Sequence, residues 1–366
     1  MNKPLLVRCL MQPQAAASLN MAEWDLLIRQ ARVSRLGARL AFELERADSL
    51  GTVPAQVRHH LDSICRVVAQ QHRALEHELD HLADATAKLK LDIVLLKGGA
   101  YAAAKLESAR GRSFSDIDIL VPKDRLSEVE AALMLKGWVS TNRDAYDQRY
   151  YREWMHEIPP MTHMKRGTTL DVHHALTPPT SRICADSAKM LARARAVANR
   201  AGFCVLCPED MVLHSATHLF LEGELDGGMR DLFDLRALIR EFSDQEDGFL
   251  ARLSARADEV GLSRPLAYAL RYLGHMLGVT FDDDVNRWVS RHLPGIPPIG
   301  FMDALFERGL LPHHRSCRDT WTKPALLALY IRGHWLRMPF HLLALHLTRK
   351  AFKREEVREE EPQAAP

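Results

Sequence analysis

The chain has 366 residues, of which 47% are hydrophobic and 26% are charged, and its formal net charge is +2. This is ordinary for a globular protein, and the length allows two or three structural units. A net charge so close to zero gives no reason to expect nucleic acid as an obligate partner.

Targeting and membrane signals are absent from the sequence pattern. Residues 1–14 contain Lys3 and Arg8 but no sustained apolar stretch, so we expect no secretory signal. Apolar runs such as residues 325–331 are far too short to span a bilayer. The six cysteines follow no disulfide framework, which favours a reduced, cytoplasmic protein.

The first 90 residues read as two helices. Residues 21–46 carry an apolar stripe that begins at Trp24, and the segment from Asp48 to Pro54 breaks the pattern. Between Val57 and Leu89, apolar residues recur at steps of three, four or seven, which predicts a second, longer helix that packs along the rest of the protein.

From Leu91 onward the apolar period changes to that of short strands, with helices between them. Arg166 and Gly167 offer the turn of an antiparallel pair within residues 150–176. We expect strands at 91–96, 117–121, 168–174 and 203–206, and helices at 100–106, 124–136 and 185–200, with further helices to the end.

These patterns predict an α+β protein with helices before and after a small core. The expected divisions are an N-terminal helical region at 1–90, a catalytic core at 91–180, a mainly helical domain at 181–352 and a charged, disordered tail at 353–366.

The central chemical signal is Asp116-Ile117-Asp118. Residues two apart on a strand point the same way, so both carboxylates face one side. Two close carboxylates repel each other unless a cation lies between them, and oxygen ligands of this kind suit Mg²⁺. Alone, the pattern is weak, because Asp-x-Asp is frequent by chance.

Two further signals strengthen the interpretation of Asp116-Ile117-Asp118 as part of a metal site. Lys97-Gly98-Gly99 lies between a buried strand and a helix, where glycines allow phosphate oxygens to approach the main chain, although a plain turn would look the same. Asp171, on a later strand, could complete a carboxylate triad for two metal ions and could accept a proton from a nucleophile. The combination is more specific than its parts.

This order of motifs resembles the nucleotidyltransferase superfamily, which includes poly(A) polymerases and aminoglycoside nucleotidyltransferases. More narrowly, it resembles an uncharacterised bacterial nucleotidyltransferase family found near many capsule and exopolysaccharide genes. The likeness runs from about Ala22 to Ile239, and its motifs lie at 96–100, 112–121, 170–173, 214–218 and 230–234.

The resemblance implies a mixed-sheet core that binds a nucleoside triphosphate with Mg²⁺ or Mn²⁺ and transfers nucleoside monophosphate to an unknown acceptor: a sugar, a small molecule or a protein. It assigns metal binding and catalysis to Asp116, Asp118 and Asp171. The nucleotide and phosphate contacts that it implies are Lys97, Gly98, Gly99, Arg112 and Ser115.

Accessory residues are less sharply defined. His173 lies beside Asp171 in a group of histidines with His156, His163 and His174, and it could orient the acceptor or act as a base, or be structural. His174 should point to the opposite face.

Helical residues beyond the core give further alternatives. His214, His218 and Glu222 share a helical face, which could hold a metal but more simply packs against the core. Arg230 and Asp234 either line the same cleft or, with Asp231, form ordinary ion pairs. Cys204-Val205-Leu206-Cys207 is a single Cys-x-x-Cys, for which we favour structure, with Pro208 opening a helix.

The C-terminal segment mixes apolar residues such as Trp335 and Phe340 with basic ones such as Arg349 and Lys353. It can pack on the domain, which we favour, or contact an anionic membrane surface. A different class of function, an inactive nucleotide-binding or scaffold protein of a surface-polysaccharide pathway, also fits the fold, but retention of all three carboxylates argues against it.

Overall fold

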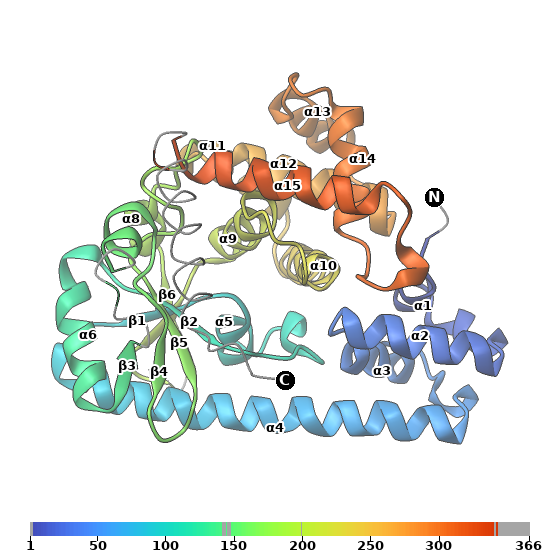
Figure 1. The fold of residues 1–366 in the computed structure, drawn as a ribbon, viewed down its shortest axis with the longest axis horizontal. Coiled ribbons are helices and arrows are strands. Elements are labelled where there is room, and N and C mark those ends of the chain that lie inside the picture. Colours follow the sequence, from blue (N-terminus) through green and yellow to red (C-terminus); the bar gives the residue numbers. More distant parts are fainter. Residues whose placement is uncertain (1–2, 141–143, 145–147, 199, 340–341, 343–366) are drawn as a thin grey trace, which may run out of the picture.

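The computed structural model describes residues 3–140, 144, 148–198, 200–339 and 342. Its fold is α+β, with a mixed sheet flanked by helices that precede and follow it in the chain (Figure 1). The predicted fold class is therefore confirmed. The charged tail 353–366 lies outside the described residues.

Four helices form the N-terminal region, and the last of them links this region to the sheet. The long helix α4 runs beneath both parts of the molecule and packs against α3 at one end and α6 at the other (Figure 1). The bounds are α1 (Leu5–Met11), α2 (Met21–Val33), α3 (Gly37–Arg46), α4 (Ala55–Thr86) and, after the second strand, α6 (Leu126–Leu135).

The single helix predicted at 21–46 is wrong, because the chain bends between α2 and α3. Arg35 lies there with a φ of 55°, in the left-handed region that ends helices. Gly37 opens α3 directly against α4, and a Cβ at this position would lie 2.9 Å from Ile64. The close approach of α3 to α4, which sequence periodicity does not show, favours the break.

The sheet has seven strands in the order β3-β4-β5-β2-β1-β7-β6. The pairs β1–β7 and β2–β5 are parallel and the other pairs are antiparallel, so the sheet is mixed. The strands are β1 (Ile93–Leu95), β2 (Ile117–Leu120), β3 (Trp138–Ser140), β4 (Met161–His163), β5 (Thr169–His173), β6 (Arg195–Ala196) and β7 (Phe203–Val205).

Two edge strands differ from the sequence prediction. The helix expected at 185–200 is only the short α8 (Ser187–Leu191), and the chain then turns into β6. Strand β3, which directly follows the glycine stop of α6, was not predicted. Because β6 and β7 come after residue 180, the segment expected to be mainly helical also contributes one edge of the sheet. The hairpin of β4 and β5, with Gly167 in the turn at φ 71°, is confirmed.

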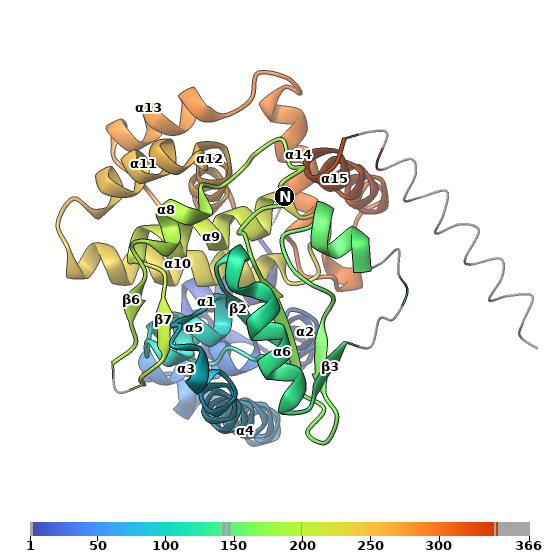
Figure 2. The same ribbon diagram turned by 90° about the vertical axis from the view of Figure 1, so that its left-hand side faces the viewer.

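Helix α9 forms the centre of the C-terminal region and is buried along almost its whole length. It packs against α10, α11, α12 and α15, and it also contacts α5 beside the sheet (Figure 2). The bounds are α5 (Lys97–Ala103), α9 (Pro208–Leu221), α10 (Gly228–Gln245), α11 (Phe249–Val260), α12 (Ser263–Tyr272), α13 (Asp283–His292), α14 (Ile299–Gly309) and α15 (Thr322–Arg337).

The last described helix, α15, packs on the domain. Leu336 is buried, Arg332 donates to the Phe220 carbonyl at 2.8 Å, and Arg182 stacks over the Trp335 ring at 4.1 Å. Phe340, Arg349 and Lys353 of the predicted basic segment lie outside the described residues. Among the helices that the structure describes, none has the length and apolarity needed to cross a membrane.

Candidate active site

The three aspartates come together on two neighbouring strands. Because β2 and β5 are parallel, Asp118 pairs directly with Asp171 in the sheet register. Asp116 lies immediately before β2 and, two residues from Asp118, faces the same side. One carboxylate oxygen from each of the three lies within 4.8 Å of the others. Ser115 donates to Asp116 Oδ1 at 2.8 Å and restricts its rotation.

Asp118 is the most strongly held member of this carboxylate cluster. Lys97 Nζ lies 2.9 Å and His173 Nε2 lies 3.1 Å from the same oxygen, Asp118 Oδ1. Burial opposes ionisation, but the Lys97 ammonium and the hydrogen bond from His173 hold the pKa of Asp118 well below its ordinary value. Asp118 is therefore ionised at neutral pH. The two side chains that contact it come from either side of β2, at the start of α5 and the end of β5.

The pKa of Asp171 is shifted in the opposite direction from that of Asp118. Burial and the nearby negative charges of Asp118 and Glu157 raise the pKa of Asp171 to about 7. Its Oδ1 is buried and has no hydrogen-bond partner among the described residues. An unpartnered carboxylate oxygen beside two other carboxylates fits a hard divalent cation. Such a cation would offset the repulsion between the carboxylates and would supply the partner that this oxygen lacks.

The raised pKa of Asp171 makes a prediction for the metal-free protein. Between about pH 4 and pH 7 the folded carboxyl keeps its proton while the unfolded one, with a pKa near 3.8, has lost it. Unfolding then releases a proton, so the free energy of unfolding falls as pH rises through this window, by at most about 1.4 kcal/mol per pH unit. Above pH 7 this contribution is constant.

Urea unfolding of wild type and Asp171→Asn at several pH values, in a chelator, isolates this effect. The asparagine variant should gain stability relative to wild type as pH rises from 4 to 7. Parallel pH profiles for the two proteins would contradict the assignment. Comparison with the variant is needed because burial also raises the pKa of Glu222 to about 7.

The Lys97-Gly98-Gly99 motif forms the first turn of α5 and does not precede it as a loop. Lys97 has a φ of 46°, a left-handed conformation that is unfavourable for a lysine. The two glycines differ. A Cβ at Gly98 would lie 1.9 Å from Arg112 Nη1, whereas one at Gly99 would meet no described atom within 4 Å. Packing therefore requires Gly98, while Gly99 faces open space.

Arg112 and Asp234 form an ion pair with each other. The hydrogen bonds that the structure gives them do not involve the carboxylate cluster. Arg112 Nε donates to Asp234 Oδ2 at 2.6 Å, and Arg39 Nη2 donates to Asp234 Oδ1 at 3.0 Å. All three residues are buried. The Arg112 guanidinium also lies against Gly98. The contacts that the structure gives Arg112 and Asp234 thus join α3 and α10 next to the Lys97-Gly98-Gly99 motif.

Helix α9 supplies the wall opposite the strands. Burial lowers the pKa of His214 to about 3 and lowers that of His218 well below its ordinary value, with the positive charge of Lys97 as the next cause in both. His218 Nε2 lies 3.2 Å from Glu222 Oε1. On α10, Arg230 pairs with Asp231 at 2.8 Å. The expectation that this face of α9 packs toward the core agrees with the contact between α9 and α5.

Two residues near the site were not identified from sequence. Arg39 lies about 70 positions before its hydrogen-bond acceptor at Ser108 and gives no local signal. Glu157 forms an isolated bridge with His173 and approaches its Nδ1 at 3.5 Å. The neighbouring His156 was noted with the histidine group, and an acidic residue beside a histidine there was the available signal for Glu157.

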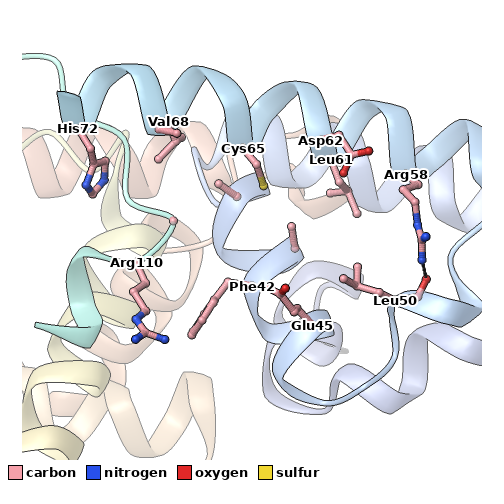
Figure 3. A pocket seen from close by; sticks show the side chains of 14 residues that line it. Phe42, Glu45, Leu50, Arg58, Leu61, Asp62, Cys65, Val68, His72 and Arg110 are labelled. Atoms are coloured by element: carbon pink, nitrogen blue, oxygen red, sulfur yellow. Dashed lines mark hydrogen bonds between the residues drawn. The ribbon is translucent and has the colours of Figure 1, made fainter. Parts of the chain in front are cut away.

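A separate groove lies between α3 and α4 (Figure 3). Its volume is about 780 Å³, and Phe42, Arg58, Cys65 and Arg110 are among the side chains that line it. None of the three aspartates contributes to its lining. The groove therefore does not include the carboxylate cluster.

A mixed sheet, an Asp-x-Asp pair on one strand, a third aspartate on its parallel neighbour and a glycine pair after the adjacent strand are the features expected of a nucleotidyltransferase. The model of a family described as uncharacterised nucleotidyltransferases matches residues 20–278, more than half of the chain, and the chain belongs to that family. No curated protein and no solved structure matches it.

Proposed function

We propose that the protein transfers a nucleoside monophosphate from a nucleoside triphosphate to an acceptor hydroxyl and releases pyrophosphate. The observation that carries the proposal is the carboxylate cluster, in which Asp116, Asp118 and Asp171 place oxygens within 4.8 Å of one another. Membership of the nucleotidyltransferase family supports a nucleoside triphosphate as the donor substrate.

The carboxylate cluster is suited to hold Mg²⁺ or Mn²⁺, since oxygen ligands fit both ions. An ion held by these residues would neutralise phosphate charge during the transfer. Asp118, whose pKa is held well below its ordinary value, supplies negative charge for such an ion, and Asp116 supplies a further carboxylate oxygen. Asp171, with a pKa near 7, is the residue that can accept the proton of the acceptor hydroxyl as the hydroxyl oxygen bonds to the α-phosphorus and the bond to the β-phosphate oxygen breaks.

Other residues have binding or positioning roles in this proposal. Lys97 contributes a positive charge beside the carboxylates for the phosphates, and the open side of Gly99 admits a phosphate oxygen. Ser115 and His173 orient Asp116 and Asp118 through the contacts described above. We place the acceptor on the α9 side, where His218 and Arg230 add polar groups, and we give Arg112 and Asp234 the role of holding Gly98.

The direct test is isothermal titration of each of the four ribonucleoside triphosphates into the wild-type protein, once with Mg²⁺ and once with a chelator. Binding that requires Mg²⁺ and prefers one base supports the proposal and identifies the donor. Absence of binding under both conditions contradicts it.

The two glycines provide a matched pair of variants. Gly98→Ala should destabilise the fold by about 1–3 kcal/mol, because its methyl group displaces the Arg112 guanidinium. Gly99→Ala meets no such clash and should leave stability unchanged or raise it by about 0.5–1 kcal/mol, while nucleotide affinity falls about tenfold. Thermal unfolding and titration measure the two effects, and unchanged nucleotide affinity in Gly99→Ala would exclude a close phosphate approach.

A further inference from the structure

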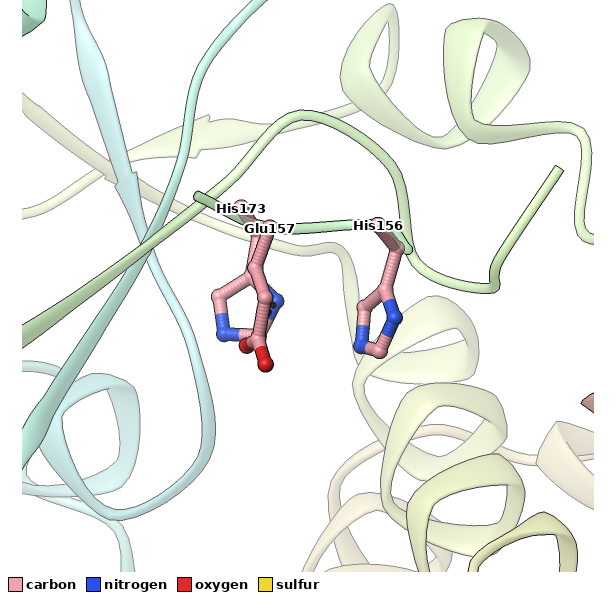
Figure 4. Close-up of side chains that lie close together, drawn as sticks. All are labelled: His156, Glu157 and His173. Atoms are coloured by element: carbon pink, nitrogen blue, oxygen red, sulfur yellow. Dashed lines mark ion pairs between the residues drawn. The ribbon is translucent and has the colours of Figure 1, made fainter. Parts of the chain in front are cut away.

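A second group of ligand-type side chains lies next to the carboxylate cluster. His156 and Glu157 follow the turn at Tyr150–Trp154 and lie beside His173 at the end of β5 (Figure 4). Backbone hydrogen bonds from His174 to the His156 carbonyl at 2.8 Å and from Ile158 to the Val172 carbonyl at 3.0 Å fix this segment to the strand. The main chain therefore holds the three side chains together without help from the side chains themselves.

The ligand-type atoms of this group lie close together. The rings of His156 and His173 have centroids 5.2 Å apart, and Glu157 Oε2 lies 3.5 Å from His173 Nδ1. One ligand atom from each residue lies within 4.8 Å of the other two. Nδ1 of His156 and Nδ1 of His173 are buried and make no hydrogen bond within the described part of the chain. His173 itself is only 2% exposed.

The contact of His173 with Asp118 determines which nitrogen is free. His173 Nε2 lies 3.1 Å from Asp118 Oδ1, and because a carboxylate oxygen accepts a hydrogen bond, Nε2 carries the hydrogen of this contact. The other ring nitrogen, Nδ1, lies on the side of Glu157, 3.5 Å from its Oε2. A histidine that donates one ring N–H to a carboxylate and uses the other nitrogen as a ligand is the usual arrangement at metal centres.

We propose that His156, Glu157 and His173 form a second metal site, which takes a borderline transition-metal dication such as Zn²⁺. Two imidazoles and one carboxylate suit this class of ion, whereas the oxygen-only carboxylate cluster suits Mg²⁺ or Mn²⁺. Three protein ligands leave a coordination position open. The bound ion fixes the His173 ring and, through its Nε2–H, the orientation of Asp118. Only this last consequence rests on the proposed function; the metal site itself does not.

The test is titration of Zn²⁺ into the full-length, chelator-treated and desalted protein, with excess Mg²⁺ present so that the oxygen-only cluster is occupied. The visible spectrum with Co²⁺ as a substitute reports nitrogen ligation. Wild type should bind one Zn²⁺ with high affinity. His156→Gln and Glu157→Gln should each weaken that affinity by about tenfold or more.

A matched control is essential because the chain contains 18 histidines. His174 is also buried, and its two ring nitrogens have no hydrogen-bond partner among the residues that the structure describes; neither cluster found in that part of the chain includes it. His174→Gln should retain wild-type Zn²⁺ affinity, and circular dichroism checks that each variant is folded. Wild-type protein that binds no Zn²⁺, or Zn²⁺ affinity that is equal in all variants, overturns the proposal.

Nucleoside triphosphate titration of the same samples keeps the two ideas separate. Zn²⁺ binding that depends on His156 and Glu157 in a protein that binds no nucleotide supports the metal site and contradicts the proposed function. Nucleotide binding without Zn²⁺ binding supports the proposed function and contradicts the metal site.

Discussion

Replacing Asp118 by asparagine is expected to weaken Mg²⁺-dependent nucleotide binding by about 100-fold or more. The variant keeps the volume of the side chain but removes the charge that Lys97 and His173 hold in place. A metal ligand contributes several kcal/mol of charge stabilisation, and about 1.4 kcal/mol corresponds to a factor of ten. Isothermal titration at saturating Mg²⁺ measures the effect.

A control carboxylate separates loss of the site from loss of a surface charge. Asp124 is exposed and follows the other end of β2, so Asp124→Asn makes the same chemical change away from the cluster. It should bind nucleotide as wild type does. Should Asp118→Asn be poorly folded, the half-buried Asp116→Asn replaces it in the comparison. Wild-type affinity in a folded Asp118→Asn protein would remove this residue from the site.

Asp234→Asn is expected to destabilise the protein by about 3–5 kcal/mol. Asp234 is 1% exposed and is the acceptor for two buried guanidinium groups, Arg39 from α3 and Arg112 from the loop before β2. Removal of the carboxylate charge leaves two buried positive charges unpaired. The free-energy cost of these unpaired charges is larger than the net stabilisation that the ion pairs contribute. Because Arg112 lies against Gly98, the Lys97-Gly98-Gly99 turn should also lose its fixed position.

Urea unfolding gives this difference as a change in transition midpoint at constant slope. Asp231→Asn on the same helix is the matched control, since the ion pair that the described residues give Asp231 is with its neighbour Arg230, in a partly exposed position. It should change the free energy of unfolding by less than about 1 kcal/mol. Equal destabilisation by the two variants would show that the buried network has no special role.

The sequence predicts those elements that depend on local pattern. The apolar period of α4, the short strand predicted at 117–121 and the turn at Gly167 are properties of neighbouring residues, and all three agree with the structure. The cap of α9 is equally local, with Cys207 before Pro208 as expected. Errors occur where a distant contact decides the local conformation. The bend before Gly37 depends on Ile64, and α8 is short because the chain must return to the sheet as β6.

The sequence by itself determined which residue types could form an acidic metal site and which strands would carry them. Only the tertiary structure decided that β5 lies parallel and adjacent to β2, which puts Asp171 opposite Asp118. It also decided that Asp234 joins Arg39 and Arg112, and that Glu157 faces His173. Strand order and buried ion pairs depend on burial and charge compensation between segments far apart in the chain. They therefore cannot be predicted from the periodicity within one segment.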